Sequence, residues 1–289
     1  MNDNTIDNTI PLVVENGMNT CYIDALFVAL FYKETPYTNF ILETTPKNPT
    51  GYYLQELIKS KFVEPIRKHY SITSNIINEI RNYALICGWA SDGNIDGQKD
   101  CSEFYTFMAD LFNIPNLEFE ILEIKNNTIT NNTHKSILPF IPLSPNTNNT
   151  IRSLLIDWIN TKIINNDIEI NHCYKLTNIP QFIILNVNRF NYNGIRNNYK
   201  IDIMKRIKFF GNNDTSQNYL KWKIHSMVCH KGESCKSGHY YAITTTHCKK
   251  WLLFDDNLVP SFEQIDLEDD DIQNKIMLEA VLIIYILDI

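Results

Sequence analysis

The chain has 289 residues, of which 44% are hydrophobic and 12% aromatic, and its formal net charge is −7. A chain of this length and composition can bury a sizeable core. The acidic charge gives no electrostatic basis for nucleic-acid binding and suits a basic partner better. The polar stretch 1–10 does not resemble a secretory signal, and the apolar run 280–287 is too short to span a bilayer.

The cysteine usage points to a reducing compartment. Seven cysteines are scattered along the chain with no C-x-x-C pair and no even framework. This pattern is typical of reduced thiols, so we expect an intracellular protein in the cytoplasm or nucleus, without a membrane segment.

The hydrophobic periodicity predicts helices in the first part of the chain and strands in the second. Predicted helices are 20–32, 51–61, 74–87, 98–112 and 151–164, and predicted strands are 117–124, 136–141, 181–190, 221–229, 239–245, 251–255 and 279–287. Asn clusters at 126–132, 146–149 and 191–198 predict loops. The order favours an α+β fold, and no polar linker or internal repeat divides it.

The first predicted helix begins with a candidate nucleophile. Helix 20–32 is apolar on every side, Asn19 or Thr20 can cap it, and Cys21 lies at its N-terminus. The helix dipole stabilises a thiolate at this position. The alternative is that Cys21 is only a small buried hydrophobe, as most intracellular cysteines are.

A candidate base and its orienting carboxylate lie near the C-terminus. His239 opens one predicted strand, Asp255 ends the next, and Asp256 follows directly. A short turn between these strands would bring Asp255 beside His239. A cysteine, a histidine and a carboxylate are the three groups that thiol-protease chemistry requires. The alternative is a hairpin with a surface Asp-Asp-Asn turn.

These segments resemble the Cys box and the His box of the ubiquitin-specific proteases, which are papain-like deubiquitinating enzymes. The Cys box is Asn16-Gly17-Met18-Asn19-Thr20-Cys21-Tyr22, and the His box is Gly238-His239-Tyr240-Tyr241 with Trp251-Leu252-Leu253-Phe254-Asp255-Asp256. The resemblance implies that Asn16 donates to the oxyanion, that His239 is the general base, that Asp255 orients it and that Asp256 assists. Residues 176–190 and 280–285 extend it over nearly everything after Leu12.

The chain departs from the family at two places in the Cys box. Met18 stands where the family usually has glycine, so a loop that needs a positive φ there must be built differently. Asp24 stands where the family favours asparagine, and a carboxylate there would oppose a thiolate. Both departures concern the oxyanion loop.

A third segment predicts a substrate-binding surface. Gln98, Asp100 and Glu103 match the family's Gln box, and the two carboxylates, three apart, share one helical face. The resemblance implies that they bind the arginines of the ubiquitin tail, Leu-Arg-Leu-Arg-Gly-Gly, with Gly238 and Tyr240 also facing the substrate. The alternative is a solvated acidic first turn.

The sequence predicts no metal site and no cofactor. His225, Cys229, His230, Cys235 and His239 lie within fifteen residues, but their spacing matches no standard zinc finger. Many family members carry a zinc ribbon of two C-x-x-C pairs, whereas here Cys173 stands alone. We therefore expect a short, metal-free fingers region.

The sequence thus predicts a papain-like α+β cysteine protease with a helical thumb, reduced fingers and an antiparallel β palm. We expect an N-terminal extension, 1–12, and a single catalytic domain, 13–289, with thumb 13–116, fingers 117–175 and palm 176–289. The expected partner is ubiquitin or a ubiquitinated protein, and the expected state is a monomer. Two alternatives stay open: a protease for another modifier such as SUMO, and a catalytically dead ubiquitin-binding module.

Overall fold

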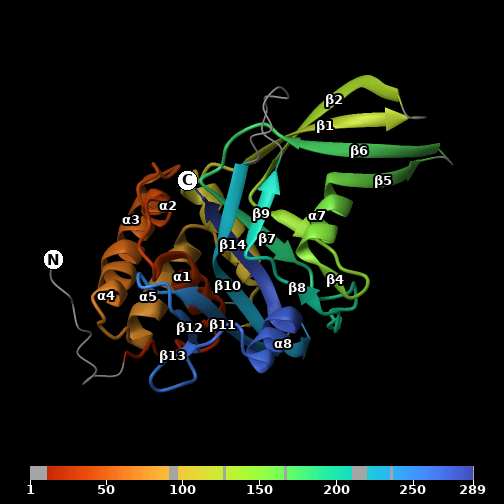
Figure 1. The fold of residues 1–289 in the computed structure, drawn as a ribbon. Coiled ribbons are helices and arrows are strands. Elements are labelled where there is room, and N and C mark those ends of the chain that lie inside the picture. The colour runs from red at the N-terminus through yellow and green to blue at the C-terminus, as the bar shows by residue number, and fades with distance from the viewer. Residues whose placement is uncertain are drawn as a thin grey trace.

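The computed structural model describes residues 12–90, 97–125, 128–165, 168–209, 220–234 and 237–288. Figure 1 shows the N-terminal helices, drawn red to orange, together on one side of the large sheet, and a smaller sheet projecting at the upper right. The helical segments are α1 (Cys21–Phe31), α2 (Pro36–Ile41), α3 (Pro49–Ile58), the π-helix η1 (Lys59–Val63), α4 (Glu64–Arg67), α5 (Ser74–Ile86), α6 (Cys101–Leu111), α7 (Ile151–Ile159) and α8 (Asp270–Glu279). None of the helices in these ranges has the length and apolar character needed to cross a membrane.

Helix α1 is the centre of the helical half. All eleven of its residues are buried, which agrees with a sequence that is apolar on every side. It packs against strand β11 (Ser237–Thr245) and β10 (Leu220–Ser234), and Tyr22 meets Phe104 of α6 edge to face at 5.5 Å. The N-terminus of α1 is therefore fixed between the sheet and a neighbouring helix.

The larger sheet has the order β13-β12-β11-β10-β14-β7-β3, with β9 also paired to β10. Its further strands are β3 (Ile141–Leu143), β7 (Phe182–Val187), β9 (Arg206–Phe209), β12 (Trp251–Phe254), β13 (Phe262–Ile265) and β14 (Ala280–Leu287), and among the strand pairs of this sheet in the described residues only β3–β7 is parallel. Alternate residues face opposite cores, so Val228 and Ala242 pack with α1 while Met227 and Ile243 pack with α7 and α8.

The smaller sheet has the order β2-β1-β6-β5. Its strands are β1 (Leu117–Lys125), β2 (Thr128–Leu138), β5 (Asn160–Asn165) and β6 (Ile168–Leu176). Aromatic contacts join it to α7, with Trp158 4.5 Å from Tyr174 and 5.1 Å from Phe119 between ring centroids. A third, two-stranded sheet pairs β4 (Asn149–Thr150) with β8 (Ile201–Asp202).

The α+β class is confirmed, but several predicted boundaries are wrong. The helix predicted at 151–164 ends at Ile159, because 160–165 form β5 and pair with β6, and the loop predicted at 126–132 is a strand from Thr128 onward. The predicted helix 98–112 begins only at Cys101, since Asp100 is its N-cap. Helices α2 and α8 were not predicted, and Glu279 belongs to α8 rather than to the last strand.

Candidate active site

Cys21 is the first residue of α1 and is 4% exposed. The loop before it is held by two hydrogen bonds: Gly17 N–H donates to Thr20 Oγ1 at 2.7 Å, and Arg81 Nη1 donates to the Met18 carbonyl at 2.8 Å. Thr20 occupies the N-cap position, but its hydroxyl makes no capping bond. The prediction that the Thr20 side chain caps the helix is therefore wrong, because its hydroxyl accepts a hydrogen bond from Gly17 in the loop instead.

The Met18 departure is accommodated by the loop backbone itself. Met18 adopts φ 68° and Asn19 φ 56°, so two non-glycine residues occupy the left-handed region. Such a residue costs about 1–2 kcal/mol. The Met18 side chain is 73% exposed, so the conformation places no bulk in the core. The loop keeps a positive φ without the glycine.

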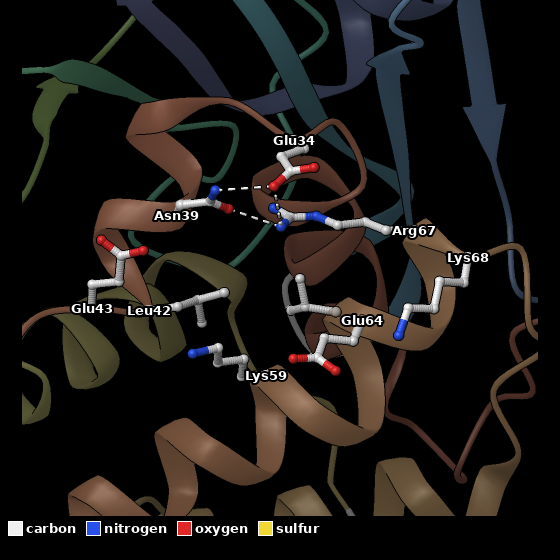
Figure 2. Close-up of a pocket in the computed structure, with 9 residues that line it drawn as sticks. Glu34, Asn39, Leu42, Glu43, Lys59, Glu64, Arg67 and Lys68 are labelled. Carbon is white, nitrogen blue, oxygen red and sulfur yellow. Dashed lines mark hydrogen bonds and ion pairs between the residues drawn. The ribbon is translucent and has the colours of Figure 1, made fainter. Parts of the chain in front are cut away.

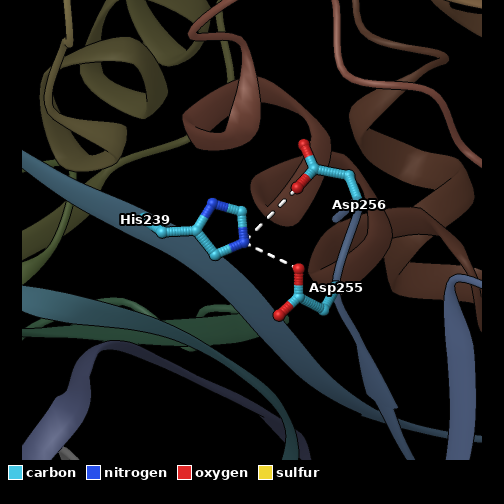
Figure 3. Close-up of side chains that lie close together, drawn as sticks. All are labelled: His239, Asp255 and Asp256. Atoms are coloured by element: carbon cyan, nitrogen blue, oxygen red, sulfur yellow. Dashed lines mark hydrogen bonds and ion pairs between the residues drawn. The ribbon is translucent and has the colours of Figure 1, made fainter. Parts of the chain in front are cut away.

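His239 lies on β11 and faces two carboxylates (Figure 3). Its Nε2 is 2.8 Å from Asp255 Oδ1 and 3.4 Å from Asp256 Oδ1. Cys21 also lies close enough to His239 for the two side chains to interact, which raises the pKa of the imidazole. The structure thus brings together the three side chains that the sequence singled out, Cys21, His239 and Asp255.

The electrostatics of this group favour a charged imidazole. Burial lowers the pKa of His239, but the hydrogen bond to Asp255, the interaction with Cys21 and the nearby negative charges outweigh it and raise the pKa to about 10. Burial raises the pKa of Asp255, yet its hydrogen bonds from His239 and from the Asn257 N–H lower it below the ordinary value. His239 and Asp255 therefore form an ion pair at neutral pH.

Asn16 lies beside the second carboxylate. Its Nδ2 donates to Asp256 Oδ2 at 2.7 Å, and Asp256 has a fully buried side chain. The chain segments that carry them are tied together, because Ser261 N–H donates to the Leu12 carbonyl and the Val14 N–H donates to Ser261 Oγ at 3.0 Å. A side-chain amide carries two N–H groups, so Asn16 retains one donor besides the one that Asp256 accepts.

The predicted substrate-facing residues lie on the approach to α6. Gln98 Nε2 donates to the Gly238 carbonyl at 2.5 Å, which ties this segment to the residue before His239. Asp100 caps α6 by accepting from the N–H groups of Ser102 and Glu103 at 2.7 and 3.2 Å. Its Oδ2 is 3.5 Å from the Tyr240 hydroxyl. Glu103 is exposed in the first turn.

Packing against the neighbouring strand explains why residue 238 is a glycine, and the sequence alone did not reveal this. A Cβ at this position would lie 2.4 Å from the His230 ring and 2.6 Å from the Lys231 carbonyl. The neighbouring strand therefore excludes any side chain at this position.

Sequence reasoning missed Asn257 and Arg81. The Asn257 side-chain amide lies 3.1 Å from both ring nitrogens of His239, and its backbone N–H donates to Asp255 Oδ1 at 2.9 Å. Its place in the Asp-Asp-Asn turn was the available signal. Arg81, on α5, is nearly buried and supports the Met18 carbonyl, and no local sequence signal links these two residues.

The cluster considered for zinc does not meet at one point in the described residues. His225 and Cys229 are buried on β10, whereas Cys235 lies outside the described residues. A group with three potential ligand atoms within 4.8 Å of one another consists of His239, Asp255 and Asp256. That group is already joined by the hydrogen bond and charge contacts described above.

A separate hollow of about 500 Å³ lies at the other end of α1 (Figure 2). Arg67 is one of the residues that line it, and it donates to the Phe31 carbonyl at 2.9 Å and to Asn39 Oδ1 at 2.8 Å. Cys21 and Phe31 are ten residues apart on a helix, which is about 15 Å. The hollow is therefore distinct from the Cys21–His239 group.

Comparison with known proteins gives consistent relatives. A model of the family described as ubiquitin carboxyl-terminal hydrolase matches residues 14–285. The chain is similar to the SAGA DUB module Ubp8/Sgf11/Sus1/Sgf73 bound to ubiquitin aldehyde, with a TM-score of 0.69 and 16% identity over 96% of this chain and 70% of that one. For the module with a Ubp8 variant bound to monoubiquitin, the TM-score is 0.71 and the identity 16%, over 96% of this chain and 69% of that one. For the yeast module with an Sgf73 mutant, the TM-score is 0.68 and the identity 15%, over 96% of this chain and 68% of that one.

These likenesses establish the fold. Identity near 16% supports no residue-level conclusion, but a TM-score near 0.7 over 96% of the chain is an extensive match. The predicted papain-like α+β arrangement of a helical part and a mainly antiparallel sheet is confirmed.

Proposed function

The chain belongs to the ubiquitin carboxyl-terminal hydrolase family, a cysteine-type deubiquitinase family, and from this premise we propose that it hydrolyses the bond after the C-terminal Gly-Gly of ubiquitin. Cys21 is the proposed nucleophile, His239 the base and Asp255 its orienting carboxylate. The observation that carries the proposal is that His239 lies between Cys21 and Asp255, with 2.8 Å between His239 Nε2 and Asp255 Oδ1. The proposed subdomains are a thumb at 13–116, fingers at 117–175 and a palm at 176–289.

The proposed reaction uses the charged imidazole. Cys21 as a thiolate, stabilised by protonated His239 and the α1 dipole, attacks the carbonyl of the terminal glycine and forms the S–C bond. His239 then gives its proton to the leaving amine as the C–N bond breaks. Water, deprotonated by His239, hydrolyses the thioester as its S–C bond breaks, and this returns the thiolate–imidazolium pair. Asp255 holds the ring and stabilises its positive charge throughout.

Two alternatives are distinguished by one experiment. The purified protein is incubated with ubiquitin carrying a C-terminal electrophile and, separately, with a SUMO probe of the same chemistry. We expect a covalent adduct with the ubiquitin probe at Cys21, located by peptide mass spectrometry. Labelling by SUMO alone would identify another modifier as substrate, and no labelling by either probe would indicate a dead binding module. The intact Cys21–His239–Asp255 chain favours the active reading.

Asn16→Ala tests the proposed oxyanion donor. We expect kcat for a ubiquitin C-terminal amide to fall by ~10²-fold with little change in KM, because the donor acts mainly in the transition state. Steady-state kinetics measure both constants. An unchanged kcat would contradict the role and leave the backbone amides of the loop as the donors.

Asp100 and Glu103 are proposed to bind the arginines of the ubiquitin tail. Asp100 also caps α6, so an alanine variant would lose the cap as well as the charge. Asparagine caps about as well as aspartate, so the Asp100→Asn and Glu103→Gln pair changes the charge and keeps the helix. Comparison of Asp100→Ala with Asp100→Asn then measures the contribution of the cap.

We expect the Asp100→Asn, Glu103→Gln pair to raise KM more than it lowers kcat, since the contact lies away from the reacting carbonyl. Each charge-assisted contact contributes ~1.5–3 kcal/mol if it is desolvated. Kinetics with tails whose arginines are alanine complete a double-mutant cycle. Additive losses would show that the carboxylates do not contact the tail, and the argument against a SUMO-like substrate would then lose its support.

A further inference from the structure

A third carboxyl, besides those of Asp255 and Asp256, lies next to the proposed site. Asp24 is in the first turn of α1, three residues after Cys21, and is fully buried. Its side chain lies next to that of Asp256, whose side chain is also fully buried. Ionised carboxylates only accept hydrogen bonds, so two neighbouring buried carboxyls can bond to each other only if one of them carries a proton.

The remaining hydrogen bonds of the two carboxyls define where that proton lies. Thr20 Oγ1 donates to Asp24 Oδ2 at 2.8 Å, and Asn16 Nδ2 donates to Asp256 Oδ2 at 2.7 Å. The other oxygen of each carboxyl, Oδ1, is buried and receives no hydrogen bond from an N–H or O–H donor of the described residues. One proton shared between the two carboxyls satisfies both groups.

The surroundings of the two carboxyls are unequal. Asp256 faces the imidazole of His239 at 3.4 Å and the amide of Asn16, both of which favour its ionised form. Asp24 has the hydroxyl of Thr20 and the thiol of Cys21 nearby instead. The proton therefore belongs on Asp24.

We propose that Asp24 is a protonated carboxylic acid that donates to Asp256, and that it is a positioning residue, holding Asp256 against Asn16 and His239. The presence of the shared proton does not depend on the proposed function, whereas the positioning role rests on that function. The pair then carries one negative charge beside Cys21 rather than two. A neutral carboxyl also donates as an asparagine amide would, which accounts for Asp24 in place of the asparagine that the resembling family favours.

The electrostatics support this assignment. Burial raises the pKa of Asp24 well above its ordinary value and the charge of Asp256 raises it further, while the Thr20 hydrogen bond lowers it only in part. The titratable groups that face Asp24 are Cys21 on its own helix and Asp256 in the turn after β12. His239 on β11 faces Asp256. The hydroxyl of Tyr22 is also nearby, since Asp24 and Arg81 on α5 both affect the pKa of Tyr22.

Infrared difference spectroscopy tests the proton directly. At neutral pH, the spectrum of the wild-type protein minus that of Asp24→Asn should show the carbonyl band of a protonated carboxylic acid. A difference spectrum with only carboxylate bands would overturn the proposal. Because this readout needs no turnover, it remains informative if the protein proves inactive and the proposed function fails.

Stability provides a second readout with a defined sign. A carboxyl whose folded pKa is raised contributes stability that is complete below its unfolded pKa and is lost as pH rises through the folded value. Asp24→Asn should therefore gain stability relative to the wild type as the pH increases, measured by urea unfolding between acidic and mildly alkaline pH. A wild type that gains stability relative to Asp24→Asn over this range would mean that Asp24 is ionised and paired, contrary to the proposal.

The positioning role has a kinetic test. Asp24→Asn keeps a donor and should retain kcat within ~3-fold, whereas Asp24→Leu removes it and should lose ~10-fold in kcat with KM nearly unchanged. Urea unfolding confirms that each variant is folded under the assay conditions. Equal losses in both variants would overturn the positioning role, because a donor would then make no difference.

Discussion

The Cys21→Ala variant is expected to lose hydrolysis of a ubiquitin C-terminal amide by at least ~10⁴-fold, because no other group in the proposed mechanism can form the thioester. The substitution removes one sulfur from a residue that is 4% exposed, so the fold should remain. Binding of ubiquitin, measured by calorimetry, should be largely retained. Turnover by Cys21→Ala would contradict the assignment of the nucleophile.

Cys101 provides the matched control. It is also the first residue of a helix, α6, and it is 1% exposed, so its helix position and burial are like those of Cys21. Burial raises the pKa of Cys101 well above its ordinary value, and no histidine is hydrogen-bonded to it among the recorded contacts of the described residues. Cys101→Ala should therefore still be labelled by the ubiquitin probe. Loss of labelling in that variant alone would mean that the wrong thiol is assigned.

The features that depend on local sequence pattern could be predicted from the sequence. Helix α1 could be predicted because an all-apolar stretch has to be buried, and His239 and Asp255 because a short turn keeps neighbouring strands together. Register was not predictable. Pairing of Ala242 with Phe254, continued along both strands, brings His239 opposite Asn257, and only this pairing reveals the amide beside the ring.

Pairing between strands also determined secondary structure where the local sequence pattern fitted both a helix and a strand. Ile163 and Ile164 fit the apolar face of a helix as well as a strand, and pairing with Ile170 and Glu169 on β6 selected the strand. Asp24 is the clearest example at the site. Its sequence position suggested a charge opposing the thiolate, and the proposal that it is neutral depends on its buried position beside Asp256.

Asp255→Asn is expected to separate the hydrogen bond from the charge. Asparagine can still accept a hydrogen bond from His239 Nε2 through its carbonyl, but it carries no charge. Removing a negative charge makes the imidazolium less favourable, so the pKa of His239 should fall from about 10. The alkaline limb of kcat/KM against pH should move to lower pH, because the charged imidazole is lost earlier.

Asp255→Ala removes the acceptor as well and should reduce kcat/KM by ~10²–10⁴-fold, which is less than the loss in Cys21→Ala, since Asp255 orients rather than reacts. Asp256→Asn is the matched comparison, because its carboxylate lies 3.4 Å from His239 Nε2 rather than 2.8 Å. It should shift the alkaline limb less than Asp255→Asn does. If Asp256→Asn moves that limb further, Asp256 is the carboxylate that holds the imidazolium, and the two roles proposed for these neighbours are exchanged.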